Sequence, residues 1–379
     1  MKSITLHETS IKKFVKNIDR EIANGFTPSL AFIYISPLFN IEKLMTKLSH
    51  FDFLIVGCTT AGEVYANEVD GACEVEGGIV AMLLDIDPNA LALTVIEVEG
   101  KDSYVVGEHV GLWAKSNFLN ASIITLTSGL TFDNDAYTQG IVSKRIEYVF
   151  GGAAADDLKL EETFVFSNHM LSNNGVVALV IDRDIINIIG ARAFGWGGIG
   201  KARIVTKASK NIVYEIDGMP AVEFYKRYLD VESSQLPQIG IEYPLEVQRR
   251  NGDVIYRAIL DFDEEKGALI FAGHVEEKSQ VRISAPKGKS IIKEVENSAL
   301  ASLEEHPEFT PQVALVFPCC SRKQVLGYLT RLEIEAITKV AKVPLIGFFA
   351  YGEIGAFPGG YGFHNETFVT AFLEERVKE

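Results

Sequence analysis

The sequence is short of cysteine and of basic residues, and each shortage excludes a class of protein. Its 379 residues include four cysteines without CxxC spacing, so we expect a reducing compartment and no disulfide framework. Lysine and arginine number 36 against 51 aspartates and glutamates, which gives a net charge of −15. Nucleic acids and anionic membranes attract cationic surfaces, so we expect neither as a partner.

Long apolar runs and catalytic motifs are also missing. No run approaches the roughly 18 apolar residues that cross a bilayer. The first residues lack the apolar core of a signal peptide, so we expect a cytoplasmic protein without membrane insertion. The seven histidines show neither HExxH nor zinc-ligand spacing, and Thr127-Ser128-Gly129 lacks the GxSxG pattern. The sequence therefore predicts no enzyme activity.

A glycine-rich segment invites a nucleotide-binding interpretation. Gly195-x-Gly197-x-x-Gly200 matches the dinucleotide fingerprint, and Lys201 follows it as in a phosphate-binding loop. Both kinds of site need a helix after the glycines, whereas residues 203–206 are typical of a strand. We predict a glycine-rich turn beside Trp196 instead.

One pattern occurs three times along the chain. An apolar strand end leads into a glycine, then into small or apolar residues, and an acid stands six positions after the glycine. A second apolar strand that ends in an acid follows each copy. The three copies are Val56–Glu63, Phe150–Asp157 and Ile346–Glu353, followed by Val80–Asp85, Val177–Asp182 and Val369–Glu374. A threefold internal repeat is an architectural signal in its own right.

The segments upstream of the three loops are alike. Each is expected to hold a helix, a strand, a second helix and a second strand. The expected helices are 11–24 and 41–50, 104–117 and 133–146, and 290–305 and 333–342; the expected strands are 29–36 and 53–57, 121–127 and 148–151, and 312–317 and 344–347. Runs such as Leu30–Ile35 are apolar throughout, as in strands buried on both faces.

The expected fold class is therefore α/β, with three repeated helix-strand-helix-strand-loop-strand units forming mixed sheets. A β-rich segment at 210–288 is inserted before the third unit at 290–379. Within it, Arg250–Asp253 predicts a hairpin turn between strands 245–248 and 254–260, since Asn-Gly favours such turns. We expect two domains, 1–207 with two units and 208–379 with the β-rich segment and the third.

Several motifs resemble the FIST family of sensory domains. The N-terminal half resembles the FIST N-terminal domain in Val56–Glu63 and in Gly195–Gly200 leading into Val205–Ala208. The C-terminal half resembles the FIST C-terminal domain in its more specific motifs, which are Tyr214–Ala221, Phe317–Lys323, Gly347–Gly355 and Phe363–Thr367. The resemblance implies a cytosolic, non-catalytic module that binds a small ligand, such as an amino acid, and signals through a partner protein.

The motif loops supply the first candidate ligand-binding residues. In one interpretation the acids Glu63 and Glu353 only hydrogen-bond turn amides. In the other they line a cleft at strand ends, where α/β sheets place ligands, and their carboxylates suit an ammonium group. We include Thr59, Thr60 and Tyr351 of the same loops in the expected site.

The C-terminal motifs supply the rest of the expected site. Arg322 is expected either to pair with a ligand carboxylate or to pair internally with Glu353. Cys319 and Cys320 are candidates for thiolate ligands or redox sensors if a neighbouring cation lowers their pKa, and otherwise are inert core thiols. His364 has Asn365 and Glu366 beside it to orient its ring.

The same resemblance implies an alternative function. Some stand-alone FIST proteins bind haem, sense nitric oxide and regulate a histidine kinase. Haem needs one axial ligand and an apolar slot, and the candidate ligands here are His364 and His169. No cofactor is certain from the sequence, and the ligand-binding and haem hypotheses both stay open at this point.

Overall fold

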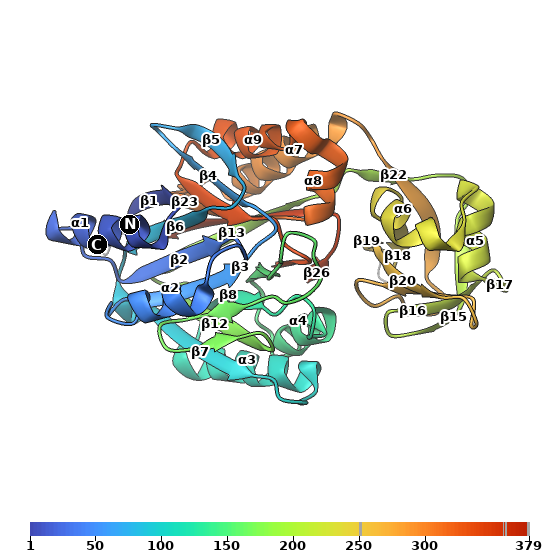
Figure 1. Cartoon of the computed structure of the whole chain (residues 1–379), viewed down its shortest axis with the longest axis horizontal. Coiled ribbons are helices and arrows are strands. Elements are labelled where there is room, and N and C mark those ends of the chain that lie inside the picture. The colour runs from blue at the N-terminus through green and yellow to red at the C-terminus, as the bar shows by residue number, and fades with distance from the viewer. Residues whose placement is uncertain (250–251, 359, 361, 377–379) are drawn as a thin grey trace.

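The chain folds into two parts, which we call the body and the lobe (Figure 1). The computed structural model describes residues 1–249, 252–358, 360 and 362–376. The body contains three six-stranded sheets, built from residues 2–193 and 313–375. The lobe contains a nine-stranded sheet built from residues 196–286.

Each sheet of the body is mixed, and the three share one strand order. In the first, the order is β1(Lys2–Glu8), β6(Ile79–Asp85), β2(Leu30–Ile35), β3(Leu54–Thr59), β10(Val165–Phe166), β11(Leu171–Ser172). In the second, it is β7(Leu91–Glu97), β12(Gly175–Asp182), β8(Ala121–Thr127), β9(Val149–Ala153), β25(Glu353–Ala356), β26(Phe363–His364). In the third, it is β13(Ile186–Ala193), β27(Phe368–Glu375), β23(Val313–Pro318), β24(Leu345–Phe348), β4(Glu63–Asn67), β5(Gly71–Val75).

Pairing directions repeat as well. The third and fourth strands of each sheet are parallel, and the other neighbours are antiparallel. The last two strands of each sheet come from another expected unit. The first sheet takes β10 and β11 from the second unit, the second sheet takes β25 and β26 from the third unit, and the third sheet takes β4 and β5 from the first unit. This strand order agrees with the expected succession of elements, while superposition of the three units stays a prediction.

The body has a common core between its sheets and an outer layer of helices. Leu30, Phe32 and Tyr34 of β2 face the central core, whereas Ala31 and Ile33 pack outward against helices. The expectation of strands buried on both faces is therefore confirmed for β2. The outer helices are α1(Ile11–Ala23) and α2(Ile41–Leu48), α3(Ser103–Asn117) and α4(Asn134–Ser143), and α7(Ser290–Glu305), α8(Cys320–Leu326) and α9(Arg331–Ala341).

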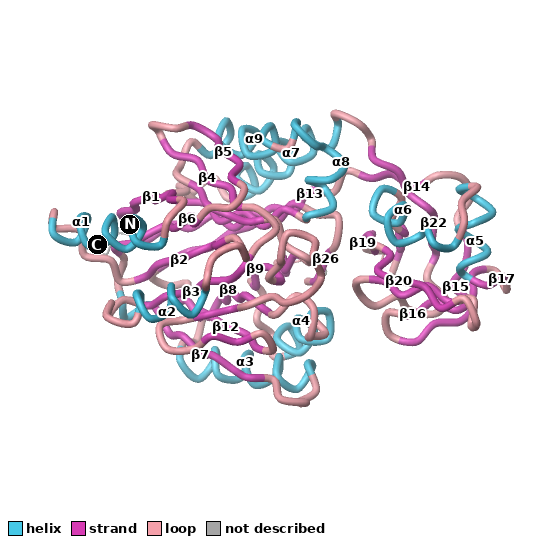
Figure 2. The backbone as a smooth tube through the Cα atoms, in the orientation of Figure 1, coloured by secondary structure: helices cyan, strands magenta, loops and turns pink. Residues whose placement is uncertain are grey.

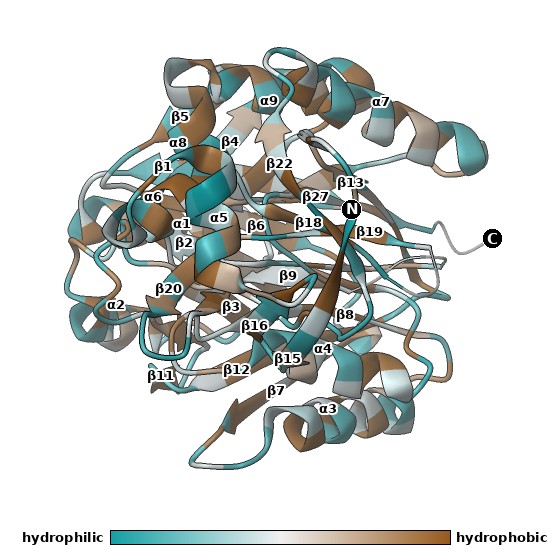
Figure 3. Ribbon diagram, turned by 90° about the vertical axis from the view of Figure 1, so that its right-hand side faces the viewer, coloured by the Kyte–Doolittle hydropathy of each residue, from teal (hydrophilic) through white to brown (hydrophobic). Residues whose placement is uncertain are grey.

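The figures show this layering directly. In Figure 2 the strands of the body run through its middle and the helices lie outside them. In Figure 3 the outer helices α3, α7 and α9 carry both brown and teal residues, because one face of each is buried and the other meets solvent. Among the described residues, no helix is long and apolar enough to cross a membrane.

The lobe has its own sheet and core. Its strands are β14(Trp196–Gly198), β15(Arg203–Ser209), β16(Ile212–Ile216), β17(Met219–Pro220), β18(Leu245–Gln248), β19(Val254–Arg257), β20(Ile259–Asp263), β21(Ala268–Phe271) and β22(Gln280–Pro286), with helices α5(Ala221–Leu229) and α6(Leu236–Glu242). β18 and β19 pair antiparallel as expected, while the predicted turn at 250–253 includes residues 250 and 251, outside the described residues. The β-rich part begins at Trp196, earlier than the expected residue 210.

Two adjacent linkers join the lobe to the body. Trp196 pairs with Pro286, so the chain enters and leaves the lobe side by side, and Lys287 N donates to Gly195 O (2.9 Å). The glycines at 195–200 lead through β14 into the strand β15, with no helix after them. The sequence predicted a strand after these glycines, and a strand is observed. A nucleotide site needs the N-terminus of a helix at this place.

Strands from both sides of the expected boundary at residue 207 share sheets in the body. β13 pairs with β27, β4 pairs with β24, and β9 pairs with β25. The N-terminal units and the third unit therefore form one continuous hydrogen-bonded body, and the lobe projects from it (Figure 1).

Candidate functional site

The three motif loops meet and bond to one another. Positions are counted from the repeat glycines Gly57, Gly151 and Gly347. In each loop, the backbone amide of the fourth residue after the glycine donates to a backbone carbonyl of another loop, that of the second residue after its glycine. The bonds run from Ala61 N to Phe349 O (3.1 Å), from Tyr351 N to Ala153 O (3.1 Å) and from Ala155 N to Thr59 O (3.0 Å). Three loops far apart in sequence thus form a closed ring of backbone contacts.

A second set of bonds shows where the ring departs from threefold regularity. Phe349 N donates to Gly62 O (2.9 Å), and Ala153 N donates to Gly352 O (2.8 Å). The corresponding amide of Thr59 donates instead to Phe164 O (2.9 Å), because the second unit has an insertion after its loop. Thr59 Oγ1 also accepts from Phe164 N (2.9 Å), so the side chain of Thr59 serves this backbone contact.

Glu63 is buried and satisfied by its own chain. Its Oε1 accepts from the hydroxyl of Thr60, and its Oε2 accepts from Gly78 N (3.2 Å). Burial raises the pKa of Glu63 to about 8, although both hydrogen bonds favour the charged form. Glu63 therefore holds together its own loop and the turn that precedes β6. This agrees with the first of the two interpretations, in which the acid hydrogen-bonds turn amides.

Glu353 occupies the corresponding place in the third unit, but it is only half satisfied. Its Oε2 accepts from Thr367 N (3.1 Å), whereas its Oε1 is buried without a hydrogen-bond partner. Burial first, and then the nearby Cys319, raise the pKa of Glu353 well above its ordinary value. The two glutamates thus hold equivalent turns and differ in one open acceptor.

The turn Phe363–Thr367, which packs on Glu353, carries a second buried carboxylate. Glu366 is fully buried, and neither of its carboxylate oxygens has a hydrogen-bond partner. Burial raises the pKa of Glu366 to about 8, opposed by the nearby Ser321 and Arg322. Its backbone φ of 61° lies in the left-handed region, which costs a non-glycine residue about 1–3 kcal/mol.

Asn365 and Cys319 complete a group that we call the polar cluster: Cys319, Glu353, Asn365 and Glu366. Asn365 Nδ2 is buried without an acceptor. Cys319 N donates to Thr367 O (2.9 Å), which places the cysteine against the same turn. Burial raises the pKa of the Cys319 thiol well above its ordinary value, so it stays a neutral thiol, as expected of a core cysteine.

Arg322 is close to this cluster but is engaged internally. It forms an ion pair with Glu333, and both side chains are fully buried. Its Nη1 also donates to Glu366 O (3.1 Å) and to Phe194 O (3.2 Å). The predicted internal pairing with Glu353 is therefore wrong: the partner is Glu333 of α9, which the sequence placed on a helix without indicating this pairing.

The lobe meets the body through a second buried ion pair. Arg257 of β19 pairs with Asp135 of α4 (3.0 Å), with side chains 0% and 1% exposed. Arg257 Nη1 also donates to Phe363 O (3.3 Å) and to Asn365 Oδ1 (3.5 Å). The polar cluster thus lies under the joint between lobe and body, in contact with both.

A more exposed pair lies at the rim of this joint. His274 of the lobe contacts Asp133 of the body (3.0 Å). The pKa of His274 is raised, chiefly by this hydrogen bond, while desolvation opposes the shift. Sequence reasoning did not identify any of these joint residues, because only the fold brings α4 and the lobe together.

The remaining predicted residues lie apart from the cluster. The hydroxyl of Tyr351 donates to Asp156, on the ring of loops. Burial opposes the charge of Asp156, but this bond and three backbone amides outweigh it and lower its pKa. Tyr351 therefore stabilises the second motif loop.

The two candidate haem ligands, His364 and His169, have different surroundings. His364 is buried, with its Nε2 3.4 Å from Gly355 O and its ring packed against Phe194. His169 lies exposed in the turn between β10 and β11. Haem needs an axial nitrogen facing an apolar slot, and haem binding through either ring stays a prediction. Among the described residues no three histidine, cysteine or acidic side chains are placed to hold a metal ion.

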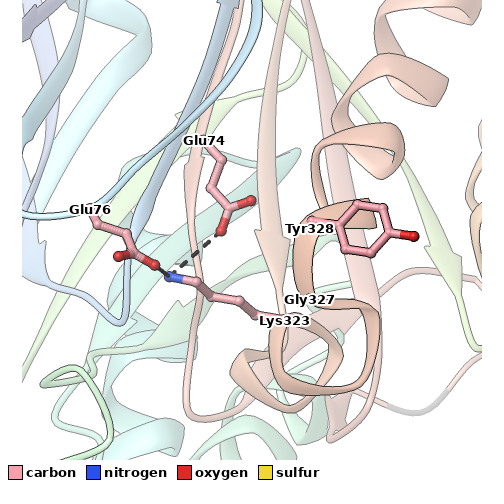
Figure 4. A pocket seen from close by; sticks show the side chains of 5 residues that line it. All are labelled: Glu74, Glu76, Lys323, Gly327 and Tyr328. Carbon is pink, nitrogen blue, oxygen red and sulfur yellow. Dashed lines mark ion pairs between the residues drawn. The ribbon is translucent and has the colours of Figure 1, made fainter.

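A surface hollow of about 470 Å³ opens near the ring of loops (Figure 4). It is lined by Glu74, Glu76, Lys323, Gly327 and Tyr328. Lys323 of α8 forms ion pairs with Glu76 (3.1 Å) and Glu74 (3.6 Å) and donates to Ala61 O (3.2 Å). Because its charge is matched within the hollow, Lys323 acts as a bridge between α8, β5 and the first loop.

Mixed sheets covered by helices, and a buried polar cluster at the joint of two parts, define an α/β protein with a candidate small-ligand site. The chain belongs to the FIST family: the FIST N domain matches residues 29–219 and the FIST C domain matches residues 221–356. FIST domains are generally taken to be sensory domains for small ligands, and the family is generally non-catalytic.

Relatives with curated sequences are distant. An uncharacterised protein of Mycobacterium bovis is 25% identical over 345 residues, which cover 79% of this chain and 86% of that protein. An uncharacterised protein of Mycobacterium tuberculosis strain H37Rv is 23% identical over 228 residues, 58% of this chain and 59% of that protein. The chain therefore spans less than two thirds of the latter relative.

Proposed function

We propose that this protein is a non-catalytic sensory module that binds a small polar ligand, such as an amino acid, in the polar cluster. The observation that carries the proposal is the set of unpartnered buried atoms at Glu353, Glu366 and Asn365. Each buried polar group left without a partner costs about 1–3 kcal/mol. A ligand that satisfies these groups recovers that cost, which supports binding here.

The contacts around the cluster supply a route from ligand to signal. Arg322 connects Glu366 to Phe194 in the first linker, and Arg257 connects the lobe to Phe363 and Asn365. A ligand that repositions the turn 363–367 changes both sets of contacts. Such a ligand shifts the balance between two arrangements of the lobe if it binds one of them more tightly.

The output of this module is proposed to pass to a partner protein in the cytoplasm, such as a histidine kinase. The support is the family membership, since FIST domains are generally taken to be sensory domains. In this proposal the partner recognises the position of the lobe, which projects from the body (Figure 1).

A screen followed by hydrogen exchange tests the proposal. Amino acids, amines and small organic acids are screened by thermal shift, and the strongest ligand is then used in exchange experiments. We expect slower exchange in residues 193–196 and 363–367 on binding, with the outer helix α3 unchanged as an internal control. The proposal fails if no compound binds, if exchange changes elsewhere only, or if the ligand is chemically converted during incubation.

A further inference from the structure

We infer that the polar cluster recognises a small organic cation whose primary ammonium group stands next to a carbonyl oxygen. The inference rests on the proposed function, because it takes the cluster to be the ligand site. It specifies the chemical class of the ligand from the groups that the chain itself leaves unsatisfied.

The unsatisfied atoms are three carboxyl oxygens, which all become acceptors once the two acids are ionised, and one amide nitrogen. Glu353 Oε1 and both carboxyl oxygens of Glu366 accept no close hydrogen bond, although Cys319 and Ser321 lie near these acids, and Asn365 Nδ2 has no acceptor. An ammonium group supplies three donors, which matches the three free oxygens in number. A carbonyl oxygen beside the ammonium supplies the acceptor that Asn365 lacks. A neutral or anionic head group does not favour the charged form of these carboxyl groups, whereas an ammonium group does.

The buried arginines of this region do not supply that cation. Arg322 is paired with Glu333 and donates to main-chain carbonyls, including that of Glu366 itself. Arg257 is paired with Asp135. Both guanidinium groups thus have carboxylate partners outside the cluster, and the side chain of Glu366 has no hydrogen bond from either.

Comparison with the first unit shows that the open acceptor is not a general consequence of the turn. Counting from the repeat glycines Gly57 and Gly347, Thr60 and Ala350 hold equivalent positions. The Thr60 hydroxyl satisfies Glu63, whereas an alanine methyl group has no donor to offer. One substitution between repeats therefore leaves Glu353 Oε1 available to a ligand.

Binding of an ammonium group has a measurable protonation signature. In the unliganded protein, burial raises the pKa of Glu366 to about 8, so this carboxyl group holds a proton at neutral pH. A cation beside it favours the charged form. Ammonium binding at pH 7 is therefore accompanied by release of a proton to the buffer, which a neutral ligand does not cause.

The test uses two probes of nearly equal shape, glycinamide and propionamide, in which an ammonium group replaces a methyl group. Calorimetric titration and thermal shift are measured with each probe at pH 7, in two buffers of different ionisation enthalpy. We expect glycinamide to bind with release of a proton, and propionamide to bind at least about 10-fold more weakly, since charge-assisted bonds are the stronger ones.

Two isosteric variants locate the binding. Glu366→Gln is expected to weaken glycinamide binding by at least about 10-fold and to reduce the number of protons released. Glu63→Gln, at the satisfied carboxyl of the first unit, is expected to leave affinity within about twofold. If Glu366→Gln does not fold, ammonium recognition is still tested in the native protein, by the comparison of the two probes and by the proton release.

Specific results overturn the inference. They are equal binding of both probes, glycinamide binding without proton release, unchanged affinity in Glu366→Gln, or no glycinamide binding up to about 50 mM, a generous limit for so small a ligand. If neutral or anionic compounds bind and protect residues 363–367 while glycinamide does not, the inference fails and the proposed function stands. If nothing binds there, both fail.

Discussion

At the scale of residues, the buried arginines of this protein hold segments of its own backbone. Arg322 contacts Glu333, Glu366 and Phe194, which belong to three separate segments. Its place beside a family motif suggested direct contact with a ligand, but every observed bond of its guanidinium group is internal. Arg322 is therefore a positioning residue for the turn at Glu366.

Removal of Arg322 is expected to destabilise the whole protein. Arg322→Met leaves Glu333 buried and unpaired, which costs about 3–5 kcal/mol in free energy of unfolding. The double variant Arg322→Met/Glu333→Leu is expected to recover most of that loss. Arg331→Met removes the exposed pair with Glu335 and should cost about 0–1 kcal/mol. Urea denaturation measures all three, and equal losses in Arg322→Met and Arg331→Met contradict the assignment.

The raised pKa of Glu63 predicts a pH dependence of stability. Because burial raises its pKa from 4.5 to about 8, the folded state keeps a proton that the unfolded state has released between these values. Its contribution to stability is therefore full below about pH 4.5 and is lost as pH rises towards 8, by at most about 1.4 kcal/mol per pH unit.

A matched variant isolates this contribution. Glu63→Gln cannot titrate, so its free energy of unfolding is expected to fall less steeply than that of the native protein between pH 5 and 8. Urea denaturation at intervals of one pH unit gives both slopes. Identical slopes show that Glu63 titrates in the folded protein as it does in the unfolded chain.

At the scale of elements, the joint between lobe and body depends on α4. Its N-cap residue Asp133 and the next acid, Asp135, contact His274 and Arg257 of the lobe. One pair is buried and the other lies at the rim, so the two acids, which are two positions apart in the sequence, have different energetic roles. The same helix packs beside β26, the strand that leads into Asn365 and Glu366 of the polar cluster.

Loss of the buried pair is expected to loosen the lobe. Asp135→Asn leaves Arg257 buried without its carboxylate, with an expected cost of about 3–5 kcal/mol and faster hydrogen exchange in β19 and β26. Asp133→Asn keeps the N-cap, because asparagine caps as well as aspartate, and should cost about 0–1 kcal/mol. Exchange mass spectrometry and urea denaturation compare the two, and similar effects of both variants exclude Arg257–Asp135 as the main latch.

At the scale of the molecule, the exchange of hairpins makes the body one folding unit. The third sheet takes β4 and β5 from the first unit, and the second sheet takes β25 and β26 from the third unit. No unit completes its own sheet. The lobe is different, because its sheet and its core are formed by residues 196–286 alone.

Two fragments test this organisation. Fragment 1–207 lacks β23, β24, β25, β26 and β27, and is expected to show no cooperative thermal transition, since two of its sheets lose strands. Fragment 195–287 keeps its whole sheet, and its ends are paired at Trp196 and Pro286, so it is expected to fold. Circular dichroism and amide NMR spectra measure both, and a cooperatively folded fragment 1–207 contradicts the single-unit body.

The sequence by itself predicted much of the local structure. Apolar periodicity placed α1 at 11–24, against Ile11–Ala23 observed, and the sequence placed the lobe strand β18 at 245–248 as observed. It missed β1, β7 and β13, the first strands of the three sheets. These strands lie at sheet edges and are partly exposed or interrupted by polar residues, so their apolar signal is weak.

What the sequence determined is therefore local: α/β elements, three equivalent loops with their acids, and motifs that mark the family. Only the tertiary structure decided which acids are satisfied, because hydrogen-bond partners such as Gly78 for Glu63 or Thr367 for Glu353 lie 14 or 15 residues away. It also decided that Arg322 binds Glu333 and that Arg257 crosses from the lobe to Asp135, 122 residues apart. Such pairs depend on long-range packing, which short-range periodicity does not encode.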